Sequence, residues 1–227
     1  MDKFGHIDTW VFDLDNTLYD STTGVFNRIG DRMTLYVAEH LKLPLPEASA
    51  LRKHYWEKYG TTLYGLMHEH KVDPDKFLAH AHDIDISDIP RCDIIREHLA
   101  HLPGRKIIFT NSSRDFATRM IKHLGIDHHF EGMFTIEDAG YLPKPRPDPY
   151  HAIASKFRFD PKKAAMFDDM EVNLKTAAEV GMTTVWIHGD NNNPDDHALP
   201  HLHHKTEKLA DWLKATTKPP QHPVKGK

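Results

Sequence analysis

Two aspartates separated by one residue, Asp13 and Asp15, follow directly after a short apolar run near the start of the chain. Along an extended chain alternate side chains point to the same side, so both carboxylates can face one reacting group. Carboxylates this close repel each other unless a cation or a shared proton relieves the repulsion. Mg²⁺ prefers hard oxygen ligands of this kind, so the spacing indicates an acidic centre that uses a divalent cation.

Three further polar groups follow or lie near the ends of apolar runs. Asp168-Asp169 form a second acidic pair, and Thr110-Asn111 offer a hydroxyl and an exposed backbone that suit hydrogen bonds to phosphate oxygens. Lys144 lies between prolines in the string LPKPRP, which restricts the position of its ammonium. A fixed ammonium can neutralise charge on a phosphoryl group during its transfer. The set therefore predicts phosphoryl-transfer chemistry.

Apolar runs supply the scaffold that brings these groups together. Runs rich in β-branched and aromatic residues predict strands at 7–12, 106–110, 164–167, 183–187 and, more weakly, 133–136. Helical patterns lie between them at 114–124, 149–157 and 171–180. This alternation predicts an α/β fold with a Rossmann-like parallel sheet core and helices on both faces. Such sheets bind ligands at the carboxyl ends of their strands, where the acidic pairs stand.

The interval 22–92 breaks this alternation, because it holds helical patterns and no convincing strand. Helices are expected there at 24–41, 47–58, 62–70 and 74–82. We therefore expect an inserted α-helical cap domain at 22–92 and a catalytic core made of 1–21 and 93–217. A terminal helix is expected at 206–214. Residues 218–227 have little apolar content, so a mobile C-terminal tail is expected there.

Composition narrows the possible partners and locations. The net charge of −4 offers no broad basic surface for a nucleic acid polymer, and no apolar run approaches the length of a membrane span. The single cysteine, Cys92, excludes an intramolecular disulfide, and the first residues do not read as a signal peptide, so a cytoplasmic location is expected. The 227 residues favour one domain with a modest insertion, as a monomer or weak homodimer.

Histidine is frequent, with 19 residues, and it clusters at two places: His128-His129, and the group of His201, His203 and His204. Neither group has partners at the spacing of a structural zinc site. We therefore expect solvated surface histidines rather than metal ligands.

The ordered motifs resemble the four motifs of the haloacid dehalogenase-like hydrolase superfamily. They are Asp13-Leu14-Asp15-Asn16-Thr17-Leu18-Tyr19, Thr110-Asn111, Lys144-Pro145, and Phe167-Asp168-Asp169 through Asn173. The insertion after the first motif is similar to that of the members with a helical cap, subfamily I. Within the cap, the string HYWEKYGTTLYGL at 54–66 resembles the pyrimidine 5'-nucleotidase branch.

This resemblance implies a Mg²⁺-dependent phosphomonoester hydrolase that works through an aspartyl-phosphate. Asp13 would be the nucleophile. Asp15 would protonate the leaving alkoxide and later take a proton from the attacking water. Thr110 and Lys144 would bind the phosphoryl oxygens, with Asn111 shaping the loop.

The resemblance also implies a ligand set for Mg²⁺. Asp13, the backbone carbonyl of Asp15 and one member of the second acidic pair would hold the ion. We favour Asp169 as the direct ligand, with Asp168 behind it. Asn173 stands where many family members place a further acid, so a supporting role is expected for it.

The expected substrate is a small phosphorylated metabolite of the UMP or CMP type. Aromatic residues of the cap could stack on a pyrimidine, because a flat ring offers its π-face. Aromatics at helical spacing also commonly form the core of such a cap. The predicted substrate contacts are Asn16, Arg28, His54, Tyr55, Trp56, Tyr59 and Tyr64.

Three alternatives stay open at this point. A sugar-phosphate phosphatase or phosphomutase of the same superfamily would keep every catalytic residue and differ in its cap contacts. A dehalogenase uses the same kind of aspartate but needs no acid two residues on, so Asp15 argues against it. A phospho-accepting signalling module of the receiver type has its acidic pair before the phosphorylated aspartate, whereas here the order is reversed.

Overall fold

One parallel sheet, with β1 at its centre, organises the chain. The computed structural model describes residues 4–190 and 198–217, and the tail expected at 218–227 lies outside them. The strands of these residues are β1 Thr9–Phe12, β2 Arg105–Phe109, β3 Gly132–Phe134, β4 Ala164–Asp168, β5 Thr183–Ile187 and β6 His204–Thr206. Their order across the sheet is β3-β2-β1-β4-β5-β6, with every pair parallel. The expected Rossmann-like α/β class is confirmed.

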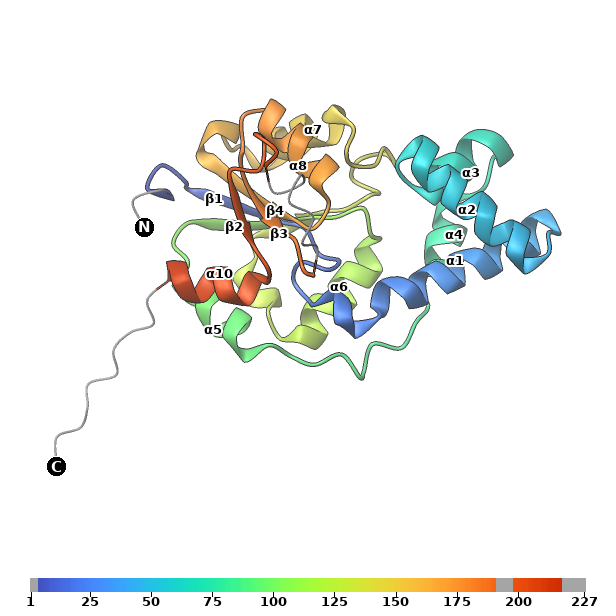
Figure 1. Ribbon diagram of the computed structural model, residues 1–227, viewed down its shortest axis with the longest axis horizontal. Helices are drawn as coiled ribbons and strands as arrows, with labels where there is room; N and C mark the ends of the chain where they lie inside the picture. The colour runs from blue at the N-terminus through green and yellow to red at the C-terminus, as the bar shows by residue number, and fades with distance from the viewer. Residues whose placement is uncertain (1–3, 191–197, 218–227) are drawn as a thin grey trace.

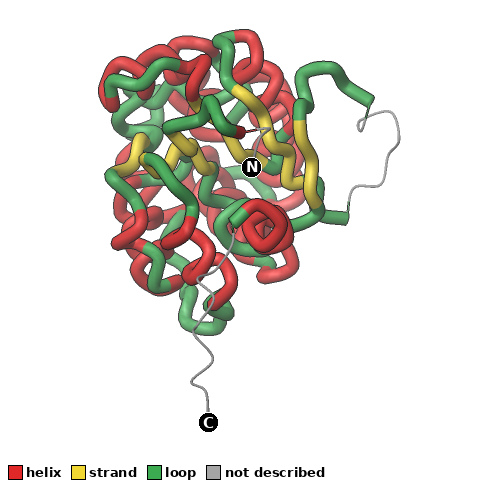
Figure 2. Tube along the Cα trace, turned by 90° about the vertical axis from the view of Figure 1, so that its left-hand side faces the viewer, coloured by secondary structure: helices red, strands yellow, loops and turns green. Residues whose placement is uncertain are grey.

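Helices cover both faces of this sheet. They are α5 Asp93–His101, α6 Arg114–Leu124, α7 Pro147–Phe157, α8 Glu171–Glu179 and α10 Leu209–Thr216, with single 3₁₀ turns at Ser21–Thr23, Asp127–His129 and Pro161–Lys163. Figure 1 shows α7 and α8 on one side of the strands and α5, α6 and α10 on the other. Figure 2 shows the strands between helical layers from a second direction.

The alternation of side chains along β1 explains both layers. Trp10 and Phe12 belong to the apolar cluster with α5, α6 and α10, and Val11 belongs to the cluster with α7 and α8. Phe12 stacks on Phe167 of β4, with ring centroids 4.6 Å apart. A strand buried on both faces needs apolar side chains on each face, and Trp10, Val11 and Phe12 supply them here.

Four consecutive helices form a separate unit beside the sheet, here called the cap helices (Figure 1). They are α1 Val25–Leu41, α2 Leu45–Tyr59, α3 Thr62–His70 and α4 Pro74–Ala81. Val37, Leu66 and Phe77 lie in the apolar cluster that these helices share. All four fall inside the interval 22–92, and the limits of a cap domain at those two residues stay a prediction.

The structure differs from the predicted elements at several places. The terminal helix α10 begins at Leu209 instead of 206, because His204–Thr206 pair with β5 as a sixth strand. Helix α5 was not expected at all. Helix α2 begins at Leu45, two residues before the expected start, since Pro46 sits in the first turn, where no backbone N–H is needed. None of the helices in the described residues combines the length and apolar character that crossing a bilayer requires.

His82, directly after α4, joins the cap helices to the core. Its ring stacks on Phe116 of α6 at 4.7 Å, and its Nδ1 lies 2.9 Å from the Ser113 hydroxyl. Arg119 donates a hydrogen bond to the His82 carbonyl at 2.6 Å. Burial, with a smaller effect from the charge of Arg119, lowers the pKa of His82 to about 4.

This shift predicts that His82 makes the protein less stable in acid. A histidine in the unfolded chain has a pKa near 6.5. Between about pH 6.5 and 4, His82 is therefore protonated in the unfolded chain and neutral in the folded chain. The free energy of unfolding should therefore fall as the pH drops, by about 2 kcal/mol from His82 alone between pH 7 and 5. Urea unfolding of wild type and His82→Gln at both pH values measures this, and the variant should lose less stability.

The exposed His151 offers a matched control. His151→Gln should keep the pH dependence of the wild type. Equal losses of stability in wild type and His82→Gln would contradict the assignment.

Candidate active site

Three strand ends place the predicted catalytic residues side by side. Asp13 follows β1, Asp168 ends β4, and Thr110 follows β2. The hydrogen-bond ladder between β1 and β4 continues past the end of β1: the Asp13 N–H donates to the Phe167 carbonyl at 2.9 Å. The site therefore lies at the carboxyl edge between β1 and β4, where the strand order reverses direction.

Three carboxylates gather at this edge. Asp13, Asp168 and Asp169 each offer an oxygen, and these oxygens lie within 4.8 Å of one another. Leu14, between the two aspartates of the first motif, is buried in the core. The cluster joins two segments more than a hundred residues apart in the sequence, as the strand order requires.

Lys144 neutralises part of this negative charge. Its Nζ lies 2.9 Å from Asp13 Oδ1, 2.7 Å from Asp168 Oδ2 and 3.0 Å from the Phe109 carbonyl, and only 2% of the residue is exposed. Asn111 fixes the lysine backbone, accepting from its N–H at 2.9 Å and donating to its carbonyl at 3.2 Å. All three ammonium protons thus have acceptors, so a phosphoryl oxygen would have to replace one of them.

The pKa values of these groups reflect the excess of carboxylates over the single ammonium. Burial raises the pKa of Asp13 well above its ordinary range, although Lys144 opposes this. Burial, followed by the charge of Asp168, raises the pKa of Asp169 to about 7. Burial also disfavours the charge on Lys144, but Asp13 and Asp168 outweigh it and raise the lysine pKa. An added cation would stabilise the ionised carboxylates, so this donor set fits a hard divalent ion such as Mg²⁺.

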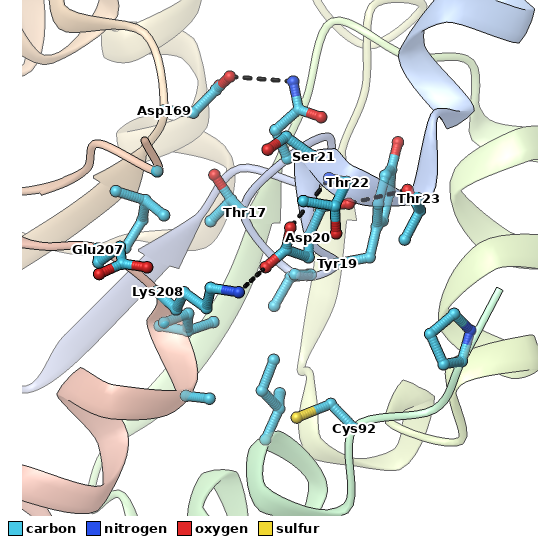
Figure 3. A pocket seen from close by; sticks show the side chains of 18 of the residues that line it. Thr17, Tyr19, Asp20, Ser21, Thr22, Thr23, Cys92, Asp169, Glu207 and Lys208 are labelled. Atoms are coloured by element: carbon cyan, nitrogen blue, oxygen red, sulfur yellow. Dashed lines mark hydrogen bonds and ion pairs between the residues drawn. The ribbon is translucent and has the colours of Figure 1, made fainter. Parts of the chain in front are cut away.

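The two members of the second acidic pair differ in how many of their carboxylate oxygens already accept hydrogen bonds. Asp168 is fully buried: its Oδ2 accepts from Lys144, and its Oδ1 accepts from the Met170 N–H and from Asn173 Nδ2, both at 2.9 Å. Asp169 Oδ2 accepts from Asn16 Nδ2 at 3.1 Å (Figure 3). No side chain or N–H of the described residues bonds Asp169 Oδ1. Asp169 is therefore the member with an oxygen available to a cation.

Asn16 turns the chain directly after the aspartates. It adopts a left-handed backbone, with φ 57°, a conformation that asparagine tolerates better than most residues. This turn brings its amide to Asp169. The Oδ1 atom of Asn16 is buried and has no hydrogen-bond partner in the described part of the chain.

Two hydroxyls hold Asp15 in place. Ser112 Oγ donates to Asp15 Oδ2 at 2.6 Å, and the Tyr19 hydroxyl donates to Oδ1. Thr110 lies behind them, with its Oγ1 accepting from the Ser112 N–H at 2.9 Å. Burial raises the pKa of Asp15 against the effect of these hydrogen bonds. Sequence reasoning gave Ser112 and Tyr19 no role, although Tyr19 stands four residues after Asp15 within the first motif.

A cleft of about 850 Å³ opens above this cluster, between the core and the cap helices. Asp13, Asp15 and Asp169 line its floor, and Thr110, which is buried, does not line it. Three predicted substrate contacts also line the cleft: Asn16, Trp56 and Tyr59.

The other four predicted contacts lie outside the lining of the cleft. Arg28 forms an ion pair with Asp88 at 2.9 Å. His54 is exposed outside the cleft, and Tyr55 is buried in the cap core, with its hydroxyl 2.6 Å from His70 Nε2. Tyr64 also lies outside the cleft lining, and the guanidinium of Arg146 stands 4.5 Å from its ring centroid. Sequence spacing could not separate these positions, because a step of one residue along a helix turns the side chain by about 100°.

Two arginines line the cleft without having been expected there: Arg52 of α2 and Arg146, two residues after Lys144. Single arginines in a charged helix or a proline-rich loop carry no signal that separates a lining residue from a surface one.

A second cavity, of about 500 Å³, adjoins the loop that carries the first motif (Figure 3). Residues 16–23 and Cys92 line it, and an ion pair of 2.9 Å between Lys208 and Asp20 crosses it. Asn16 and Asp169 line both cavities. The start of the first-motif loop therefore borders both cavities.

The two histidine groups take no part in the carboxylate cluster. His203 Nδ1 lies 3.0 Å from the Thr184 N–H, and the His201 carbonyl accepts from the Thr184 hydroxyl at 2.5 Å, so this group anchors the chain entering β6. His128 and His129 lie in the 3₁₀ turn after α6. Among residues 4–190 and 198–217, no histidine belongs to a cluster with the geometry of a metal site.

Comparison with known proteins gives one family and several relatives. Residues 7–181 match the model of the haloacid dehalogenase-like hydrolases. Phosphate metabolism protein 8 of Saccharomyces cerevisiae is 29% identical over 191 residues, which cover 75% of this chain and 58% of that protein. The chain thus spans little more than half the length of this curated relative.

Solved structures share the fold. A dehalogenase solved with an intermediate complex is 16% identical, with a TM-score of 0.61, over 94% of this chain and 98% of the other. The magnesium-bound hydrolase YfnB from Bacillus subtilis is 17% identical, with a TM-score of 0.60, over 91% of this chain and 96% of the other.

The buried position of Lys144 predicts a large loss of stability when its charge is removed. Lys144→Met leaves Asp13 and Asp168 buried without their counter-ion, which should cost about 3–5 kcal/mol in the free energy of unfolding. Urea unfolding at pH 7 measures the loss. Adding Asp168→Asn to this variant should recover part of it, because one uncompensated charge disappears.

Lys53, whose side chain is 72% exposed and pairs with Glu57 at 3.8 Å, provides the control. Lys53→Met should leave the unfolding midpoint unchanged, because an exposed ion pair contributes little. A loss below about 1 kcal/mol for Lys144→Met would contradict the role of this lysine as counter-ion.

Proposed function

Because the chain belongs to the haloacid dehalogenase-like hydrolases, we propose that it hydrolyses phosphomonoesters with Mg²⁺ through an aspartyl-phosphate on Asp13. The observation that carries this proposal is Asp15, which stands two residues after Asp13 and lines the same cleft. Ser112 and Tyr19 both hold its carboxylate. A dehalogenase needs no general acid there, and the likeness to dehalogenase structures, at 16% identity, concerns the fold.

In the first step a carboxylate oxygen of Asp13 attacks phosphorus and the ester P–O bond breaks. Asp15, in its protonated form, gives its proton to the leaving oxygen. In the second step Asp15 takes a proton from water, whose oxygen attacks the same phosphorus. The bond between phosphorus and Asp13 then breaks, which releases inorganic phosphate and restores the carboxylate.

The fit of the donor set supports a metal at this site. Asp13 and Asp169 would hold Mg²⁺, with Asp168 and Asn173 behind them, and the bound ion would supply positive charge to the phosphoryl oxygens. Lys144 holds Asp13 from the side of β2 and opposes the rise of its pKa. The YfnB hydrolase, which shares the fold, was solved with magnesium bound, and this agrees with the assignment.

For the substrate we propose a pyrimidine nucleoside 5'-monophosphate of the UMP or CMP type. Two exposed aromatic residues in the cleft support a flat leaving group: Trp56 is 44% exposed and Phe26 is 53% exposed. The name of the yeast relative supports a role in phosphate metabolism. A sugar-phosphate phosphatase or phosphomutase is the second candidate, because it would need the same core.

A substrate panel tests the proposal directly. Phosphate release is measured with UMP, CMP, AMP, GMP, ribose 5-phosphate, glucose 6-phosphate and p-nitrophenyl phosphate, with Mg²⁺ and after EDTA. We expect the highest kcat/KM for UMP and CMP and no turnover after EDTA until Mg²⁺ is restored. Preference for the sugar phosphates would move the substrate to the second candidate, and turnover in EDTA would refute the metal.

Variants of the two aspartates separate their roles. Asp13→Asn should abolish turnover, because no nucleophile remains, while circular dichroism stays that of the wild type. Asp15→Asn should slow hydrolysis of UMP, whose alkoxide leaves poorly, far more than that of p-nitrophenyl phosphate, whose leaving group needs little protonation. Equal losses for both esters would exclude Asp15 as the general acid.

A further inference from the structure

The cap side of the cleft holds an arginine without an acidic partner in the described part of the chain. Arg52 of α2 is half-buried and lines the cleft. The other two arginines of the cap helices lie outside the lining, and each forms an ion pair: Arg28 with Asp88 and Arg32 with Asp83. Arg52 is thus set apart from them by both its position and its pairing.

The neighbouring helix fixes the plane of the Arg52 guanidinium. Its Nε donates to the Thr34 hydroxyl of α1 at 3.1 Å. A Cβ placed on Gly30 would lie 3.6 Å from Cζ, Nη1 and Nη2 alike, so the guanidinium lies flat against α1 at this glycine. The Thr62 hydroxyl donates to the Arg52 carbonyl at 3.2 Å and holds the backbone.

This arrangement leaves the two Nη groups as directed donors. No acceptor among the described residues bonds Nη1 or Nη2 of Arg52. A guanidinium held through Nε and one face keeps its remaining N–H groups in a fixed fork, which suits acceptor oxygens at the edge of a ligand.

Apolar side chains surround this fork in the cleft. Trp56 lies one helix turn beyond Arg52 on α2, and Phe26 lies on α1. Ile29 and Met33 of α1 also line the cleft. Apolar and aromatic side chains of this kind favour a flat ring. A few hydrogen-bond donors among them give specificity, because they pair only with rings that carry acceptors at matching positions. A sugar alone offers neither a flat face nor a carbonyl edge.

We infer that Arg52 is a specificity-determining residue, whose Nη groups donate hydrogen bonds to a carbonyl oxygen at the edge of a planar leaving group. The inference rests on the proposed function and deepens it, because it assigns the recognition of the base to one side chain. The ligand class is a nucleoside 5'-monophosphate whose base carries a carbonyl beside the ring nitrogens. A leaving group without that oxygen leaves the fork unpaired and loses its advantage.

The test compares wild type with Arg52→Gln on four esters: UMP, CMP, ribose 5-phosphate and p-nitrophenyl phosphate. Arg52→Gln should lower kcat/KM for the two nucleotides by about tenfold to a hundredfold, the range for a lost hydrogen bond to a charged group. For the two esters without a base, the change should stay below about twofold. Inhibition of p-nitrophenyl phosphate hydrolysis by uridine should weaken in parallel.

Two further variants keep the test decisive. Arg52→Lys keeps the charge without the fork and should fall between wild type and Arg52→Gln on the nucleotides, even where the glutamine variant fails to fold. Arg32→Gln breaks an ion pair outside the cleft and should keep the substrate ratios of the wild type.

The outcomes separate the inference from the proposed function. Suppose that the wild type prefers UMP and CMP, and that Arg52→Gln lowers kcat/KM equally for all four esters or leaves it unchanged. This result would overturn only the role of Arg52. A wild type that prefers ribose 5-phosphate to UMP would contradict the proposed substrate and would overturn the inference with it.

Discussion

The buried ammonium of Lys144 is the interaction on which the rest of the site depends. It contacts carboxylates from two strands, Asp13 after β1 and Asp168 in β4, and the carbonyl that ends β2. Without it, two acidic groups would face each other at the centre of the sheet, where burial already disfavours their charge. Asn111 fixes the lysine backbone, and Asn173 satisfies the far side of Asp168. The polar network thus ties the strand ends into one rigid floor.

The sequence predicts the core side of the cleft better than the side formed by the cap helices. The core strands can be recognised in the sequence as apolar runs that stop at polar residues. A parallel sheet built from them brings Asp13, Asp168 and Thr110 to the same edge. The lining on the cap side depends on which side of each cap helix faces the cleft. Tyr55 and Trp56 are neighbours in sequence, yet one is buried in the cap core and the other lines the cleft. Helix rotation, which packing against other helices decides, separates them.

Other elements escaped because their signals are tertiary. The strand β6, His204–Thr206, has three residues and no alternating apolar pattern, and only its pairing with β5 defines it. The support of Asp15 by Ser112 joins residues 97 positions apart. Such contacts depend on the exact register of two loops, which local propensity does not encode. The same reasoning applies to the fixed plane of Arg52, which depends on the glycine at position 30 of another helix.

The central place of β1 also bears on how the chain is made. β1 is synthesised first, yet its two neighbours begin at Arg105 and Ala164. The cap helices, which contact one another within residues 25–81, can assemble while the ribosome still holds the rest. Trp10, Val11 and Phe12 meanwhile have no strand to pair with, and an unpaired apolar strand invites association with other chains. The residues that later support the nucleophile are therefore the ones a chaperone would have to shield longest.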